Sequence, residues 1–179
     1  DAMNIEGLSE MTLEKLIGAG LVKEPADLFE VDNFRDEFIS MEGFGEKSFE
    51  NLKKSVEKAK ETTPERLLYS LGVPGIGKAN ARLIAQHCHN KWDDIESLEF
   101  GDLIQIEGIG DIMAEGFVKY FSDAKNKKKV SDILDKIHLD ESEEMGENTL
   151  DGLTFVITGS LNKYENRDAL KDAIQKAGG

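Results

Sequence analysis

A short glycine-containing pattern that recurs along the chain constrains the fold more than any other feature of the sequence. It consists of an apolar residue, any residue, glycine, an apolar residue and a second glycine, and its first glycines are Gly7, Gly43, Gly75 and Gly108. These glycines lie 36, 32 and 33 residues apart, and Ser9 replaces the second glycine in the first copy. A repeat of this length is one supersecondary unit. The pattern therefore predicts pairs of helices joined by tight turns.

Each copy is followed by a run of apolar residues at helical spacing, such as Leu13, Leu16 and Ile17 after the first copy. Glycine lets the chain turn sharply, and we expect the apolar residue between the glycines to hold the turn against its helices. The next helix then begins with N–H groups that point outward. Together with the helix dipole, these donors form a phosphate site that needs few charged side chains. The predicted helices span residues 12–19, 48–59, 79–88 and 112–121.

These turns predict a surface that binds the phosphates of DNA. Lys47 and Lys78 lie at the start of the second helix in their copies and can each add a charge-assisted contact. The fourth copy has Asp111 and Glu115 there instead, which weakens the case for phosphate binding at that copy. The predicted DNA-binding residues are Gly7, Ser9, Gly43, Phe44, Gly45, Lys47, Gly75, Ile76, Gly77, Lys78, Gly108 and Gly110.

The third copy also contains Gly72 and Gly77-Lys78 at the spacing of a nucleotide-binding P-loop. A P-loop needs a Ser or Thr hydroxyl after the lysine and a buried strand before the glycines. Here the next residue is Ala79, and residues 63–71 are predicted as a short helix with Thr63 as its N-cap. Binding of a nucleoside triphosphate is therefore not predicted.

Charge and cysteine content narrow the classes of protein further. The chain has 22 basic and 36 acidic residues, a formal net charge of −14, so any contact with DNA must depend on local geometry. The single cysteine, Cys88, cannot form an internal disulfide, which indicates a reducing compartment. We expect Cys88 to be a small buried apolar residue. His87-Cys88-His89 is not predicted as a metal site, because consecutive helical residues point about 100° apart.

The four copies resemble helix-hairpin-helix motifs, which bind DNA without sequence specificity through hairpin amides at minor-groove phosphates. In their order they resemble the C-terminal half of bacterial NAD-dependent DNA ligases. That resemblance rests on "NIEGLSEMTLEKLIGAGLVKEPADLF", "MEGFGEKSFENLKKSVEKAK", "RLLYSLGVPGIGKANARLIAQHC" and "IEGIGDIMAEGFVKYF". The last part, "LDGLTFVITGSLNKYENRDALKDAIQKAGG", resembles the first strand and helix of the BRCT domain of that family.

The resemblance implies a parent enzyme that transfers AMP from NAD to a lysine and then to the 5′ phosphate of a nick, which it seals in replication, repair and recombination. It also implies Mg and structural Zn in the parent. The family motif Lys-x-Asp-Gly has no match here, because its nearest string, residues 149–152, begins with Thr149. One cysteine cannot supply a four-cysteine zinc finger. We therefore expect an excised fragment with no catalytic, cofactor or metal site, inactive on its own.

The predicted fold is mainly α. Residues 1–137 are expected to form a compact all-α domain of four helix-hairpin-helix repeats, with the first two hairpins paired and the last two paired. Residues 138–149 hold five carboxylates and no Lys or Arg, which is typical of a solvated linker. Residues 150–179 are expected to be an incomplete α/β unit like the start of a BRCT domain. Thr158 and Gly159 match phosphate-binding positions of such domains, although a simple turn is the favoured interpretation.

The expected partners are nicked double-stranded DNA and the upstream catalytic domains of the same chain. We expect a monomer in the bacterial cytoplasm, associated with the nucleoid, and no membrane partner, since no apolar run approaches about 20 residues. Two alternatives stay open. The negative net charge favours a helical protein-interaction or scaffold domain. The motifs alone also fit a fragment of another DNA-repair protein. The basic run at residues 125–129 is either an exposed helix face or a site of phosphate attraction.

Overall fold

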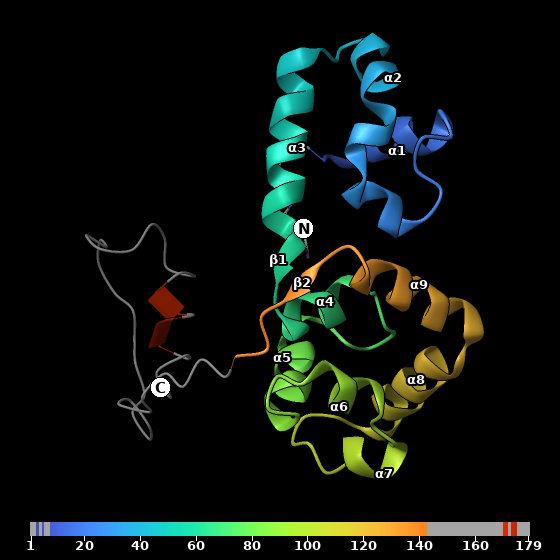
Figure 1. Ribbon diagram of the computed structural model, residues 1–179. Helices are drawn as coiled ribbons and strands as arrows, with labels where there is room; N and C mark the ends of the chain where they lie inside the picture. The colour runs from blue at the N-terminus through green and yellow to red at the C-terminus, as the bar shows by residue number, and fades with distance from the viewer. Residues whose placement is uncertain (1–2, 4, 6–7, 143–169, 172, 175–179) are drawn as a thin grey trace. The chain divides into compact units, whose positions relative to one another are not determined.

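The computed structural model of the chain describes residues 3, 5, 8–142, 170–171 and 173–174, and most of these are helical (Figure 1). The chain divides into two compact units, residues 1–141 and 142–179. The incomplete α/β unit predicted for residues 150–179, with Thr158 and Gly159, and the first glycine of the pattern, Gly7, lie outside the described residues.

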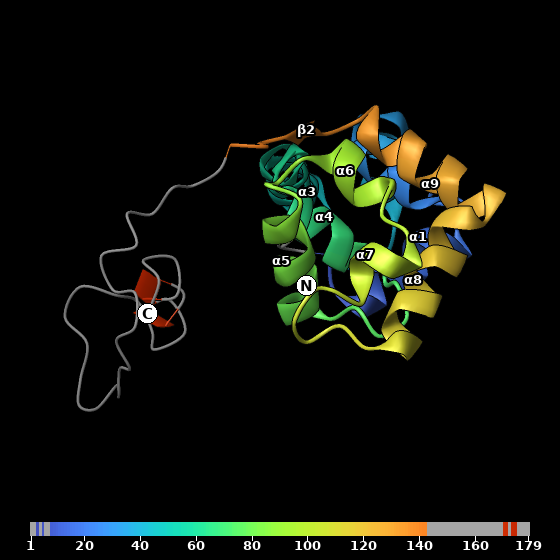
Figure 2. The same ribbon diagram turned by 90° about the horizontal axis from the view of Figure 1, so that it is seen from below.

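The first half of the helical unit contains one long helix and several short ones. Near the start, α1 is followed by two 3₁₀ helices and a short α2, and the chain then enters the long α3. In Figure 1 these elements gather around the upper part of α3, which Figure 2 shows almost end-on. Their bounds are α1 (Glu10–Gly18), η1 (Pro25–Phe29), η2 (Val31–Phe34), α2 (Arg35–Ser40) and α3 (Glu46–Lys60).

The second half packs shorter helices around a separate set of aromatic side chains. The ring centroids of Phe117 and Phe121 lie 4.6 Å apart, and those of Trp92 and Phe121 lie 6.3 Å apart. The elements are β1 (Glu61–Thr62), α4 (Pro64–Ser70), α5 (Lys78–His87), α6 (Trp92–Glu96), α7 (Phe100–Leu103), α8 (Asp111–Ser122), α9 (Ala124–Leu134) and β2 (His138–Leu139).

Side-chain caps mark the start of two helices, and a buried apolar face explains the packing of a third. The hydroxyl of Thr63 accepts a hydrogen bond from the backbone N–H of Arg66, and Pro64 is the first residue of α4, as predicted. Asp123 caps α9 in the same way. The long α3 buries one face, whose spacing follows the helical period. The buried residues of that face are Phe49, Leu52, Val56 and Ala59.

The expected all-α domain also contains a small parallel sheet. Glu61 pairs with His138 and Thr62 with Leu139, and the N–H of Asp140 donates to the carbonyl of Thr62 at 2.8 Å. Thr62 is buried, so its backbone groups need partners that water cannot supply. The pairing places the first residues of the predicted linker inside the helical unit, which extends to Glu141. Among the described helices, none is long and apolar enough to cross a bilayer.

Candidate nucleic-acid interface

The four glycine-containing segments share one backbone hydrogen bond. In each, the N–H of the apolar residue after the first glycine donates to the carbonyl three residues earlier, at 3.0 to 3.3 Å. The first glycine has a φ of +86° at Gly43, +79° at Gly75 and +94° at Gly108. This bond with a positive φ at the third residue is typical of a type II turn, which explains the need for glycine there. The donors are Leu8, Phe44, Ile76 and Ile109.

The second glycine is the N-cap of the following helix in three of the segments. Gly45, Gly77 and Gly110 have extended backbones. As N-caps of α3, α5 and α8 they provide no side chain that accepts a hydrogen bond from the first amides of the helix. These three turns lie between α2 and α3, α4 and α5, and α7 and α8. Glycine has no side chain to cover the first amides, so the start of each helix keeps N–H donors available to an anion.

Ser9 makes the first segment different. Its hydroxyl accepts from the backbone N–H of Thr12 at 3.1 Å and lies 2.9 Å from the hydroxyl of Thr12. One of the amides that could face a phosphate is therefore already bonded within α1. The replacement of glycine by serine was visible in the sequence, and the structure gives it a capping role.

The apolar residue between the glycines holds the turn, as predicted. Ile76 is 4% exposed and Ile109 is 5% exposed, and both belong to the core. Phe44 is half-buried and packs on Phe38, with ring centroids 4.7 Å apart. Phe44 and Ile76 were predicted among the DNA-binding residues. Their amides are bonded inside the turn, so these two N–H groups are already occupied.

The third and fourth hairpins pack against each other reciprocally. A Cβ placed on Gly108 would lie 3.2 Å from a methyl carbon of Leu83, the sixth residue of α5. A Cβ on Gly116, the sixth residue of α8, would lie 3.1 Å from the carbonyl oxygen of Pro74. Each hairpin thus contacts the helix that follows the other. Gly75 joins this contact, because its Cβ position lies 3.2 Å from Cγ of Met113.

A corresponding contact joins the first two segments. Lys15, the sixth residue of α1, donates from Nζ to the carbonyl of Glu42 at 3.2 Å. Glu42 holds the same place in its turn as Pro74 does in the third hairpin. The Lys15 ammonium also lies 5.0 Å from the centroid of the Phe44 ring. The sixth helix residue therefore meets the partner turn in this part of the molecule too.

Basic side chains are placed unevenly around these turns. Lys47 is the second residue of α3, whereas Lys78 is the first residue of α5, and both are exposed. The first residue of α3, Glu46, forms an ion pair with Arg35 of α2. Sequence reasoning missed Arg35, which lies outside the repeated pattern, although its presence offsets the negative charge of Glu46 beside the second hairpin.

The fourth hairpin has the opposite character. Asp111 is the first residue of α8, and Glu107 and Glu115 are exposed nearby along the chain. Ile112, the second residue of α8, is 87% exposed, and Ile104 before the turn is 45% exposed. Acidic and apolar side chains accompany this hairpin, so its amides are less suited to phosphate than those of the third hairpin.

The His87-Cys88-His89 segment forms no ligand set. α5 ends at His87, and His89 has a φ of +51°, so these residues do not share one helix. With Asp94 and Asp102 they line a hollow of about 280 Å³. Within the described residues, no three His, Cys, Asp or Glu side chains come close enough to hold a metal ion. Cys88 is 5% exposed, as expected for a buried apolar residue, and burial raises the pKa of its thiol to about 11.

Comparison with known proteins adds evidence of descent. The helix-hairpin-helix motif family matches residues 66–130, which contain the third and fourth hairpins. The whole chain is 53% identical over 180 residues to a DNA ligase of Ruminiclostridium cellulolyticum. The chain is related to bacterial DNA ligases. It is also 48% identical over 180 residues to a DNA ligase of Lachnoclostridium phytofermentans, and 35% identical over 185 residues to one of Fusobacterium nucleatum.

These matches confirm the resemblance to DNA ligases that the ordered motifs indicated. Each of the three alignments covers 100% of this chain but only 26% to 28% of the relative. The chain thus spans about a quarter of the length of the DNA ligases that it matches.

Proposed function

We propose that the helical unit binds the phosphate backbone of duplex DNA, without sequence specificity and from the minor-groove side. Four helix-hairpin-helix repeats, two to a pair, provide the surface. The third hairpin is the principal site, and the second hairpin supports it. The first contributes less because Ser9 occupies an amide, and the fourth contributes less because its neighbours are acidic.

The start of α5 is the single observation that supports this function best. Gly77 is exposed, has no atom within 4 Å of the position of a Cβ, and leaves the helix without a side-chain cap. A phosphate oxygen can therefore approach the first amides closely. Lys78 at the first helical position adds positive charge where the helix dipole already favours an anion. This arrangement needs no positive net charge, which fits a chain of −14.

The second part of the proposal concerns the whole protein. The chain would be the C-terminal region of an NAD-dependent DNA ligase that uses Mg and a structural Zn, and it would hold DNA while upstream domains of the same chain seal the nick. It would act as a monomer in the cytoplasm. The fragment itself would lack ligase activity, because no Lys-x-Asp-Gly motif occurs in it. Residues 150–179 would begin a BRCT-like domain.

Fluorescence anisotropy tests the binding function directly. The 179-residue chain is titrated with nicked duplex, intact duplex and single-stranded DNA of two unrelated sequences over a salt series. We expect both duplexes to bind better than the single strand, equal affinity for the two sequences, and a loss of affinity as salt rises. Failure to bind any duplex at low salt would refute the function.

A second candidate function is protein docking at the fourth hairpin. The observation that favours it is Ile112, which is 87% exposed beside acidic residues. An exposed apolar residue with negative neighbours suits a protein with an apolar and basic surface. Replacement of Ile112 by Ser separates the two functions. Unchanged DNA affinity, with loss of binding to upstream ligase domains supplied in trans, would favour docking for this hairpin.

A further inference from the structure

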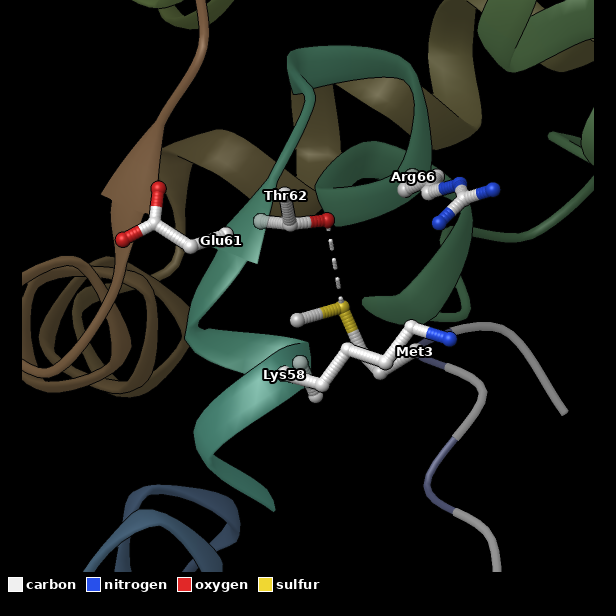
Figure 3. Close-up of a pocket in the computed structure, with 6 residues that line it drawn as sticks. Met3, Lys58, Glu61, Thr62 and Arg66 are labelled. Atoms are coloured by element: carbon white, nitrogen blue, oxygen red, sulfur yellow. Dashed lines mark hydrogen bonds between the residues drawn. The ribbon is translucent and has the colours of Figure 1, made fainter. Parts of the chain in front are cut away.

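A small pocket, lined by none of the turn glycines, lies between the end of α3 and the start of α4 (Figure 3). Its volume is about 270 Å³, just below the range of about 300–1,000 Å³ typical of sites for small organic ligands. The space suits one anionic group better than a nucleoside. It is lined by Met3, Lys58, Ala59, Glu61, Thr62 and Arg66.

Two positive side chains converge on this pocket. Figure 3 shows the ammonium of Lys58 and the guanidinium of Arg66 on the same side, while the carboxylate of Glu61 points away across β1. Neither cation forms an ion pair with any residue that the structure describes. In contrast, Lys60 of the same helix end is paired with Glu57 at 2.6 Å. In a chain of net charge −14, two converging cations that have no ion pair among the described residues require an explanation.

A buried hydroxyl provides a third donor. Thr62 is only 5% exposed, and its Oγ1 donates to the sulfur of Met3 at 4.0 Å, drawn as the dashed line in Figure 3. A thioether is a weak acceptor, so the hydroxyl gains from a stronger one. An oxyanion between Lys58 and Arg66 supplies such an acceptor. It also relieves the repulsion between the two cations.

We propose that this pocket binds a phosphate group through Lys58, Arg66 and Thr62. The chemistry fits a backbone phosphate of DNA and a free phosphate equally, and the closeness of the pocket to the third hairpin along the chain favours DNA. Arg66 lies in the first turn of α4, and the third hairpin follows the end of that helix. From Arg66 to Ser70, the last residue of α4, the helix spans only about 6 Å. With DNA as the source, the pocket extends the surface of the proposed function and rests on it.

Two titrations of the full 179-residue chain test this pocket. Inorganic phosphate is titrated while NMR follows the amide of Thr62, and duplex DNA is titrated by anisotropy over a salt series. The test variant is Lys58→Ala/Arg66→Ala, with Lys58→Gln/Arg66→Gln as a second form that keeps side-chain bulk. The control is Lys23→Ala/Lys54→Ala, which removes two exposed lysines that do not line the pocket. Lys54 lies one helical turn before Lys58 on α3, so its removal takes one positive charge from the same part of the helix as the removal of Lys58 does.

The expected result is a saturable shift of the Thr62 amide in the wild type and the control that both test variants lose. If the source is DNA, the slope of log affinity against log salt falls by about 0.9 in the test variants relative to the control, as for one phosphate. Loss of the shift with an unchanged slope supports the site and assigns it to free phosphate.

Absence of a saturable shift in the wild type, with equal slopes in all variants, would overturn the proposal. A wild type that takes phosphate here but no duplex would refute the DNA-binding function and leave the pocket standing.

Discussion

The side-chain nitrogen of Asn80 lies 3.4 Å from the sulfur of Met113, and each is the third residue of the helix that follows its glycine turn. Equivalent positions of two hairpins thus meet, as expected where two copies of one motif pack around a local twofold axis. The same Asn80 nitrogen donates to the carbonyl of Gly75 at 2.9 Å. Asn80 therefore ties the turn of the third hairpin to the start of α5.

Replacement of Asn80 by Ala should lower the free energy of unfolding by about 0.5–1.5 kcal/mol, because one hydrogen bond to the turn is lost. Gln86→Ala is the matched control, since Gln86 is exposed on the same helix. We expect it to change stability by less than about 0.5 kcal/mol. Urea unfolding measures both, and equal values would contradict a tethering role for Asn80.

Glycines 75 and 101 should respond in opposite ways to alanine. Gly75 has a φ of +79° and its Cβ position lies 3.2 Å from Met113, so Gly75→Ala should destabilise the chain by about 1–3 kcal/mol. Gly101 lies in α7 with nothing within 4 Å, and alanine favours helices there, so stability should be unchanged or slightly raised. Thermal unfolding followed by circular dichroism compares them. A Gly75→Ala variant as stable as the wild type would refute the turn geometry.

Ser9 should act as a cap rather than as a ligand. Ser9→Ala removes the bond to the amide of Thr12 and should cost about 1 kcal/mol, whereas Ser9→Gly should cost only a few tenths. Because Ser9→Gly also frees that amide, its affinity for duplex DNA should equal or exceed that of the wild type. Urea unfolding and anisotropy give the two readouts. A clear loss of DNA affinity in Ser9→Gly would show that the serine itself contacts the ligand.

Cys88 should be unreactive in the folded chain. Burial, with the nearby charges of Asp94 and Asp102, raises the pKa of its thiol to about 11, so almost no thiolate exists at pH 8. A thiol reagent at pH 8 should therefore modify the native chain far more slowly than the chain in urea.

The same shift fixes the sign of a pH effect on stability. A pKa raised on folding stabilises the folded state below the unfolded value near 9, and this contribution is lost as pH rises toward about 11. Cys88→Ala should lack that loss between pH 8 and pH 10.5. An identical decline in both proteins would argue against the thiol as its source.

The sequence predicts the long helices and the turns well, because both depend on local patterns. The four predicted helices match α1, α3, α5 and α8 to within two residues at each end. The apolar period and the glycine N-caps carry that information. The turn bonds follow from the same pattern, since a positive φ at the third residue requires glycine at Gly43, Gly75 and Gly108.

Other features depend on contacts that no local pattern encodes. η1, η2, α2, α6 and α7 are too short to show a helical period. The pairing of Glu61–Thr62 with His138–Leu139 joins residues far apart in the chain. At the candidate interface, the bond from Asn80 to Gly75 and the ion pair of Arg35 with Glu46 are likewise visible only in three dimensions.

Gly77 provides the most direct test of amide recognition. Its φ of −82° and ψ of −177° suit any residue, and no atom lies within 4 Å of its Cβ position, so Gly77→Val should fold normally while its side chain covers the first amides of α5. The comparison variant is Lys125→Ala/Lys127→Ala, which removes two exposed charges of α9. In anisotropy titrations with one duplex at one salt concentration, we predict an affinity loss on the order of tenfold, about 1.4 kcal/mol, for Gly77→Val and a much smaller loss for the lysine variant. Equal losses, or a greater loss for the lysine variant, would contradict recognition through the glycine turns.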